Sequence, residues 1–324
     1  MKKQKKKIFR ATLFAVTSIL ITQTISIAEA FAQSHEPAST GYVSVNGLDY
    51  YYEIHSERNS SSGASSQAKP LLLLHGGLGS IDMFEPILPI LAENRQVIGV
   101  DLHGHGRTEL GDRPINYEDM GNDMAALVTN LGYEQVDVMG YSMGGGVALR
   151  LAIQHPELVR RLVSVSAGFS KDGFYPEMVT QQEQINAEMA DAMEGTPMHQ
   201  SYIELAPNPD DFPRLVDRMG EFMRQSYDWS EEVGELEMPV MLVFGDSDMF
   251  RPEHIVEFYQ LLGGGLKDAG WMRENMSQNR LAILPNLTHY EIFMVPELAQ
   301  TTLPFLNGKN DPPSWSEQVQ SAQN

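Results

Sequence analysis

The pentapeptide Gly140-Tyr141-Ser142-Met143-Gly144 is the feature that most constrains the fold of this chain. The residues before it, 135–139, are mostly apolar and include two valines, as in a buried strand, whereas residues 145–152 have helical composition and spacing. A serine in a sharp strand-to-helix turn has a crowded backbone, so the positions two before and two after it must be almost free of side chain. Both are glycine, and the sequence therefore predicts a tight turn that exposes Ser142 at the start of a helix.

The rest of the chain must supply the context for this motif, because five residues alone are compatible with a chance loop. Asn46-Gly47 separates two strand-like segments and predicts a hairpin. Further apolar segments predict buried strands at 70–74, 97–100, 158–165, 239–244 and 281–284. Helical patterns, among them 83–93 and 117–131, alternate with them. This alternation predicts a parallel sheet with helices on both faces and functional residues at the carboxyl ends of its strands.

The strand pattern is interrupted between about residues 168 and 235, where the sequence is helical and rich in Met, Glu and Gln. We interpret this interruption as a helical lid inserted into the sheet domain. The predicted organisation is a signal peptide at 1–32, a first core part at 33–169, the lid at 170–235, a second core part at 236–308 and a disordered tail at 309–324.

The first 32 residues have the pattern of a secretory signal peptide. Five lysines precede a mostly apolar stretch at 8–27, and two Ala-x-Ala sites, 28–30 and 30–32, follow it. A retained membrane anchor is the alternative, since the stretch is nearly long enough to span a bilayer. The chain has no cysteine, which excludes a lipidated cysteine and disulfides. We expect an exported protein, periplasmic or secreted, without stable membrane association after cleavage.

The net charge of the chain argues against some classes of binding partner, but it does not identify a substrate. The formal net charge is −20, and it is −25 without residues 1–32, which hold six of the 23 Lys and Arg and one of the 43 Asp and Glu. Such an acidic chain repels nucleic acids and anionic membrane surfaces, so we expect a small-molecule substrate. The oligomeric state is open.

Residues for nucleophilic catalysis follow three of the predicted strands. A serine hydroxyl is a poor nucleophile at neutral pH, and it needs a histidine to take its proton and a carboxylate to orient that histidine. Asp248 lies in the loop after the 239–244 strand, and His289 lies in the loop after the next strand. The chain therefore has the order Ser142, Asp248, His289, which is characteristic of one fold family.

The sequence resembles the α/β-hydrolase superfamily from about residue 42 to 306. The matching motifs are His-Gly-Gly-Leu-Gly at 75–79, Asp-Leu-His-Gly-His-Gly at 101–106, Gly-Tyr-Ser-Met-Gly-Gly at 140–145, Gly-Asp-Ser-Asp at 245–248 and Asn-Leu-Thr-His at 286–289. The resemblance implies an α/β fold with a mostly parallel eight-stranded sheet. It also implies Ser142 as nucleophile, His289 as base and Asp248 as orienting acid, with the backbone N–H groups of Gly77 and Met143 as the oxyanion hole.

Several of these assignments have alternatives. Asp246 competes with Asp248 for the role of the acid, although the family pattern favours the residue three after the glycine, and His289 could instead be a structural histidine. The neighbouring His103 and His105 suggest a metal site, but without carboxylate or cysteine ligands at suitable spacing we expect a packed loop, no metal and no cofactor. His75 is interpreted as an organiser of the oxyanion loop. The lid methionines and Trp229 either line an acyl site or pack on the core.

The nucleophile favours acyl chemistry. Relatives that open epoxides or displace halide carry Asp at the position of Ser142, because a carboxylate attacks carbon by displacement. We therefore predict a serine hydrolase of carboxylic esters, with lactones included as substrates. Thioesters, amides and a perhydrolase side activity stay open. The alternatives are a carbon–carbon bond hydrolase of the same fold and a ligand-binding protein that retained the pocket.

Overall fold

One mixed sheet of eight strands is the scaffold of the protein. The computed structural model describes residues 36–56, 68–308, 315, 319 and 321, so the predicted signal peptide and most of the predicted tail lie outside the described residues. The strand order is β1-β2-β4-β3-β5-β6-β7-β8. Strands β3 to β8 are parallel to one another, whereas β2 is antiparallel to both β1 and β4. The predicted α/β fold class with a mostly parallel sheet is confirmed.

The strands of the sheet are β1 Ser39–Val45, β2 Leu48–His55, β3 Leu71–Leu74, β4 Val97–Val100, β5 Val136–Tyr141, β6 Val159–Val165, β7 Val240–Ser247 and β8 Arg280–Thr288. The α-helices of the described residues are α2 Leu88–Leu91, α3 Tyr117–Asn130, α4 Met143–Gln154, α5 Pro176–Glu183, α6 Pro197–Leu205, α7 Phe212–Arg224, α8 Ser230–Gly234, α9 Pro252–Leu261 and α10 Pro296–Leu306. None of the described helices combines the length and apolarity that a bilayer span requires.

The predicted hairpin is present between β1 and β2. Val45 pairs with Leu48, and the two turn residues between them, Asn46 and Gly47, have φ of 49° and 85°. These left-handed conformations suit asparagine and glycine, and they match the twist of the flanking strands.

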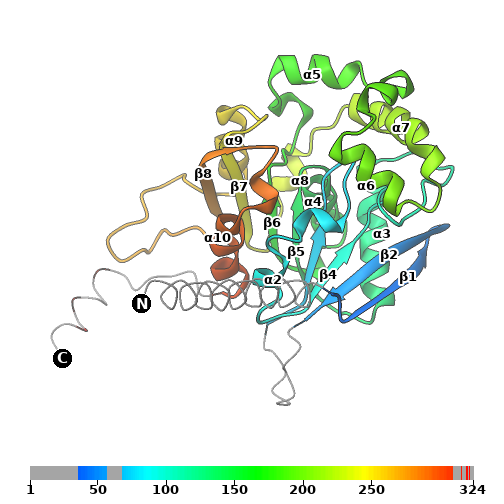
Figure 1. Ribbon diagram of the computed structural model, residues 1–324. Helices are drawn as coiled ribbons and strands as arrows, with labels where there is room; N and C mark the ends of the chain where they lie inside the picture. The colour runs from blue at the N-terminus through cyan, green and yellow to red at the C-terminus, as the bar shows by residue number, and fades with distance from the viewer. Residues whose placement is uncertain (1–35, 57–67, 309–314, 316–318, 320, 322–324) are drawn as a thin grey trace, which may run out of the picture. The chain divides into compact units, whose positions relative to one another are not determined.

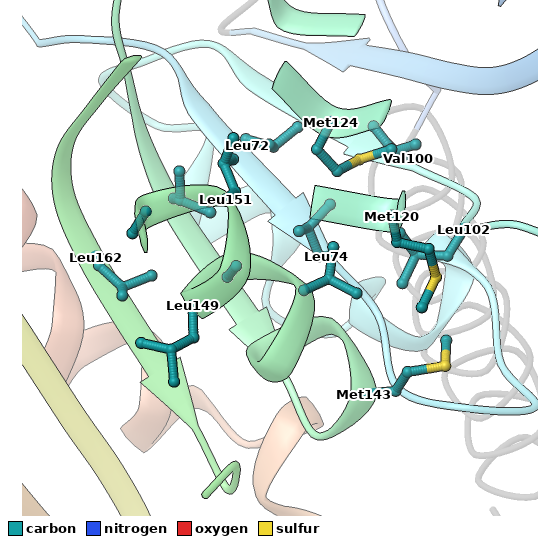
Figure 2. Close-up of a cluster of buried hydrophobic side chains, with 14 of the residues drawn as sticks. Leu72, Leu74, Val100, Leu102, Met120, Met124, Met143, Leu149, Leu151 and Leu162 are labelled. Atoms are coloured by element: carbon teal, nitrogen blue, oxygen red, sulfur yellow. The ribbon is translucent and has the colours of Figure 1, made fainter. Parts of the chain in front are cut away.

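Alternating side chains of the strands divide the core into two layers. All four residues of β3 are fully buried: Leu72 and Leu74 face one hydrophobic cluster, and Leu71 and Leu73 face the other. Figure 2 shows the first cluster, in which strand residues meet side chains of α3 and α4. Residues of α2 and α10 pack in the second cluster. Helices therefore cover both faces of the sheet, as the strand pattern predicts.

The segment between β6 and β7, predicted as a lid, is helical. It contains α5 to α8, and Figure 1 shows α5, α6 and α7 gathered at one end of the sheet. The buried face of α7, with Leu215, Val216 and Met219, belongs to the same hydrophobic cluster as Met143 at the start of α4. The insertion thus shares a hydrophobic cluster with the helix that begins beside Ser142.

The expected helix at 83–93 is wrong as a single element. The segment forms a 3₁₀-helix at Ile81–Phe84 and one α-helical turn at Leu88–Leu91. Pro86 and Pro89 explain the break, because proline lacks the N–H of the helical ladder and its ring clashes with the preceding turn.

A buried ion-pair network fixes the amino end of β5. The carboxylate of Asp137, which is fully buried, accepts hydrogen bonds from Arg95 Nη1 at 2.8 Å and from Arg160 Nε at 2.9 Å. Arg160 Nη2 also donates to the carbonyl oxygen of Leu306 at the end of α10. The network therefore joins β5, β6 and α10.

We expect Asp137→Ala to lower the free energy of unfolding by about 3–5 kcal/mol, because it leaves the buried Arg95 guanidinium without its anion. Denaturant titration followed by circular dichroism measures the change. Asp112→Ala is the matched control, since Asp112 pairs with Arg214 at the surface and its loss is expected to change stability little. Equal effects of the two substitutions would contradict the structural role of Asp137.

Candidate active site

Ser142 occupies a strained turn between β5 and α4. Its φ and ψ are 52° and −118°, outside the regions that serine normally adopts. Two hydrogen bonds hold the turn: the Ser142 N–H donates to the carbonyl oxygen of Val165 on β6 at 2.9 Å, and the Gly146 N–H donates to the Ser142 carbonyl oxygen at 3.1 Å. The helix α4 begins at Met143, so the positive end of its dipole lies at the serine.

The two glycines of the motif are required by close backbone contacts. A Cβ on Gly140 would lie 2.1 Å from the carbonyl oxygen of Gly144, and a Cβ on Gly144 would lie 2.4 Å from the carbonyl oxygens of both Leu74 and His75. Backbone atoms cannot move aside as a flexible side chain can. The spacing that organised the sequence argument therefore has a steric cause.

His289 lies between Ser142 and Asp248. Its Nε2 is 2.9 Å from Ser142 Oγ, and its Nδ1 is 3.1 Å from Asp248 Oδ1. The two contacts fit a neutral imidazole that accepts from the serine hydroxyl and donates to the carboxylate. Both His289 and Asp248 are buried. The structure thus joins the three residues that follow β5, β7 and β8.

The carboxylate of Asp248 is held by three donors besides His289. Oδ1 accepts the N–H of Met249 at 2.8 Å, whereas Oδ2 accepts the hydroxyl of Ser166 at 2.5 Å and the N–H of Gly245 at 3.3 Å. Asp246, the alternative acid, is exposed and accepts instead the N–H of Asn286 at 3.0 Å. Asp248 is therefore the aspartate that contacts His289, whereas Asp246 stabilises the loop.

The loop after β3 runs beside the turn at Ser142. A Cβ on Gly76 would lie 3.4 Å from Ser142 Cβ, and a Cβ on Gly77 would lie 4.0 Å from Met143 Cβ and 2.9 Å from Met219 Cε of α7. Within the described part of the chain, neither the Gly77 N–H nor the Met143 N–H donates a hydrogen bond. The two residues predicted to form the oxyanion hole therefore lie side by side, and their N–H groups have no hydrogen-bond partner among the described residues.

His75 connects this loop to the loop after β4. Its Nδ1 lies 2.7 Å from the carbonyl oxygen of Gly76, and its Nε2 accepts the N–H of Leu102 at 2.9 Å. Complete burial lowers the pKa of His75 to about 4, which keeps the ring neutral and its Nε2 an acceptor. These contacts give His75 the organising position that the sequence argument proposed.

His103 and His105 pack inside the loop after β4. His103 Nε2 lies 2.7 Å from the carbonyl oxygen of Leu110, and His105 Nδ1 lies 2.8 Å from that of His103. Among the described residues there is no cluster of three or more His, Cys, Asp or Glu side chains suited to a metal ion. The structure therefore gives these two histidines backbone hydrogen bonds.

Two further residues, Tyr141 and Ser166, belong to the site and were not predicted from the sequence. The Tyr141 hydroxyl donates to the carbonyl oxygen of His289 at 2.7 Å, and the two rings lie with centroids 5.2 Å apart. Burial raises the pKa of Tyr141, so its hydroxyl stays a donor. Ser166 directly follows β6, so the strand-end rule that selected Asp248 and His289 could also have selected Ser166.

Comparison with known proteins agrees with this architecture. The family model described as the alpha/beta hydrolase fold matches residues 69–197. The 2-hydroxymuconate semialdehyde hydrolase of Pseudomonas sp. strain CF600 is 41% identical over 106 residues, which are 31% of this chain and 38% of that protein. The chain therefore matches well under half of the length of that relative.

Solved structures extend the likeness over most of the chain. Carboxylesterase CesB from Bacillus subtilis superposes with a TM-score of 0.60 at 21% identity, covering 88% of this chain and 98% of that structure. The enol-lactonase from Burkholderia xenovorans has a TM-score of 0.60 at 20% identity, with 82% and 100% covered. Identities this low show the fold alone. The sheet topology and these likenesses show that the chain has the α/β-hydrolase fold, and residues 69–197 match the family model of that fold.

We expect Gly144→Val to abolish folding or to lower the yield of soluble protein severely, because its Cβ would overlap the backbone of β3. Ser142→Ala, in the same turn, removes a hydroxyl without adding volume and should leave the circular dichroism spectrum and the unfolding midpoint near those of the unchanged protein. A soluble Gly144→Val protein with an unchanged midpoint would contradict the steric argument.

Hydrolytic activity should fall as the pH is lowered, because a protonated His289 has no lone pair with which to accept the serine proton. Burial lowers the pKa of four other histidines: His75, His103 and His254 to about 4, and His105 to about 3. These four rings therefore stay neutral above about pH 5 and do not change charge in the range measured. Measured kcat/KM between pH 5 and 8 tests this, and a flat profile would contradict it.

Proposed function

We propose that this protein is a serine hydrolase that cleaves carboxylic esters, lactones included, through an acyl-serine intermediate. The observation that carries the proposal is the hydrogen-bonded series Ser142, His289 and Asp248, with distances of 2.9 Å and 3.1 Å. A nucleophile, a base in contact with it and a carboxylate that orients the base are the parts that acyl transfer needs.

The geometry supports a two-step reaction. His289 Nε2 takes the proton of Ser142 as Oγ attacks the carbonyl carbon, and the same nitrogen then protonates the departing alcohol. In the second step a water gives its proton to His289 and attacks the acyl-serine, which releases the carboxylic acid and restores the serine. Asp248 holds Nδ1 throughout, so the ring keeps the tautomer that faces Ser142.

The oxyanion of each tetrahedral intermediate requires donors near Ser142. The N–H groups of Gly77 and Met143 are the proposed donors, and the dipole of α4 favours negative charge at the same place. Loss of one such donor typically slows kcat by about 10²–10³-fold. A Cβ at position 77 would lie 2.9 Å from the flexible end of Met219 and at ordinary contact distance from Met143, so these two side chains border the loop at Gly77.

Two features support an ester or a lactone as substrate. Two of the solved structures with this fold are a carboxylesterase and an enol-lactonase. In addition, two apolar side chains lie beside the turn, since Met143 and the fully buried Met219 are near Gly77. We propose that α7 acts as part of a lid over the acyl portion, with Met219 in contact with it.

Hydrolytic carbon–carbon cleavage is the second candidate. The observation in its favour is the relative from Pseudomonas, which is named for 2-hydroxymuconate semialdehyde and not for an ester. The same series of serine, histidine and carboxylate would serve either reaction, so the choice depends on the substrate. Turnover of a ring-opened dienone faster than any ester would favour this candidate.

We expect the protein to hydrolyse p-nitrophenyl acetate and p-nitrophenyl hexanoate, with release of p-nitrophenol followed by absorbance. Ser142→Ala should lose about 10³-fold or more in kcat, since it removes the nucleophile. The ratio of the two substrates measures the depth of the acyl site. Equal rates in both proteins, or none in either while the fold is intact, would contradict the proposed function.

A further inference from the structure

Ser166 stands in an unusual backbone conformation at the carboxyl end of β6. It directly follows Val165, it is fully buried, and its N–H donates to the carbonyl oxygen of Val243 on β7 at 2.8 Å. Its φ of 49° lies in the left-handed region, which glycine occupies without strain and serine does not. A serine at this position therefore costs the fold stability that a glycine would not.

Among the described residues, the hydroxyl of Ser166 has one hydrogen-bond partner, and this partner belongs to the site. Ser166 Oγ donates to Asp248 Oδ2, the carboxylate oxygen that does not face His289. A carboxylate accepts about four hydrogen bonds, and Asp248 has four donors, two on each oxygen. On Oδ2 the other donor is the Gly245 N–H at 3.3 Å, so Ser166 supplies the shorter of the two contacts.

Removal of the Ser166 hydroxyl would take away one of the two hydrogen bonds to Oδ2 of the Asp248 carboxylate. Oδ2 would keep only the longer contact with Gly245, and rotation of the carboxylate would draw Oδ1 away from His289. The imidazole would then lose part of the interaction that fixes its tautomer and stabilises its protonated form during the reaction. The effect would reach Ser142 through His289 without any contact between Ser166 and the substrate.

We propose that Ser166 is a positioning residue of this hydrolase, whose hydroxyl fixes the Asp248 carboxylate against His289. The proposal rests on the proposed function of the Ser142, His289 and Asp248 series. Backbone strain that persists at one position indicates that the side chain there has a role that offsets it. The buried contact with Asp248 identifies that role.

Two substitutions separate positioning from stability. Ser166→Gly removes the hydroxyl and relieves the backbone, whereas Ser166→Ala removes the hydroxyl and keeps the strain. The matched control is Ser164→Ala: Ser164 is a fully buried serine on the same strand, and its hydroxyl has no hydrogen-bond partner among the described residues.

The first readout is ester hydrolysis with kcat and KM determined separately. The second is the rate at which a fluorophosphonate probe labels Ser142, followed by mass spectrometry. In that reaction the serine oxygen bonds to phosphorus, fluoride leaves and His289 takes the proton, so labelling reports on nucleophile activation without an ester substrate. Unfolding midpoints are measured in parallel.

We expect kcat and the labelling rate to fall by about 10-fold or more in both Ser166 variants, in line with the loss of a hydrogen bond to a charged group. KM should stay within about twofold, because the lost interaction acts on the reaction and not on substrate binding. Ser166→Gly should have the higher unfolding midpoint of the two, and Ser164→Ala should match the unchanged protein in rate.

Four outcomes would overturn the proposal. The first is an unchanged kcat and labelling rate in a folded Ser166 variant, and the second is a set of rates that decrease in parallel with the unfolding midpoints. The third is an equal loss of kcat in Ser164→Ala. The fourth is failure of both Ser166 variants to fold, which would assign the residue to the fold alone. Labelling of the unchanged protein without turnover of any ester would overturn the proposed function but not this inference, provided that labelling slows in the variants. Absence of labelling and turnover in the unchanged protein would overturn both.

Discussion

The close contact between the turn at Ser142 and the carboxyl end of β3 is the constraint on which the site depends. Gly144 lies so near the carbonyl oxygens of Leu74 and His75 that any side chain would separate the two elements. This contact places the loop after β3 beside Met143. The backbone of the turn at Ser142 thus also sets the position of the loop that contains Gly77.

A second set of interactions links four neighbouring strands through their carboxyl ends. Ser142 follows β5, Ser166 follows β6, Asp248 follows β7 and His289 follows β8, and hydrogen bonds connect them in the order Ser142, His289, Asp248, Ser166. Tyr141 adds a bond from β5 to the backbone of His289. Because each residue is anchored to a strand of one sheet, the geometry requires little ordering when substrate binds.

Sequence reasoning reached the sheet, the hairpin and the residues at the strand ends because each depends on a local pattern or on chain order. It missed Ser166, whose contact with Asp248 joins residues 82 positions apart and depends on neighbouring strands that no local pattern specifies. The prediction of one helix at 83–93 was wrong because it relied on the apolar composition of the segment and did not take account of Pro86 and Pro89. The contact of Met219 with Gly77 depends on how α7 packs, which periodicity alone does not determine.

The central claim is that Ser142 forms a covalent acyl intermediate. The most direct test mixes the protein with p-nitrophenyl acetate, quenches the reaction rapidly with acid and analyses the digested chain by mass spectrometry. The account predicts an acetyl group on the peptide that contains Ser142, formed at a rate that His289→Ala lowers strongly. An acetyl group on another residue during turnover, or turnover that persists unchanged in Ser142→Ala, would contradict it.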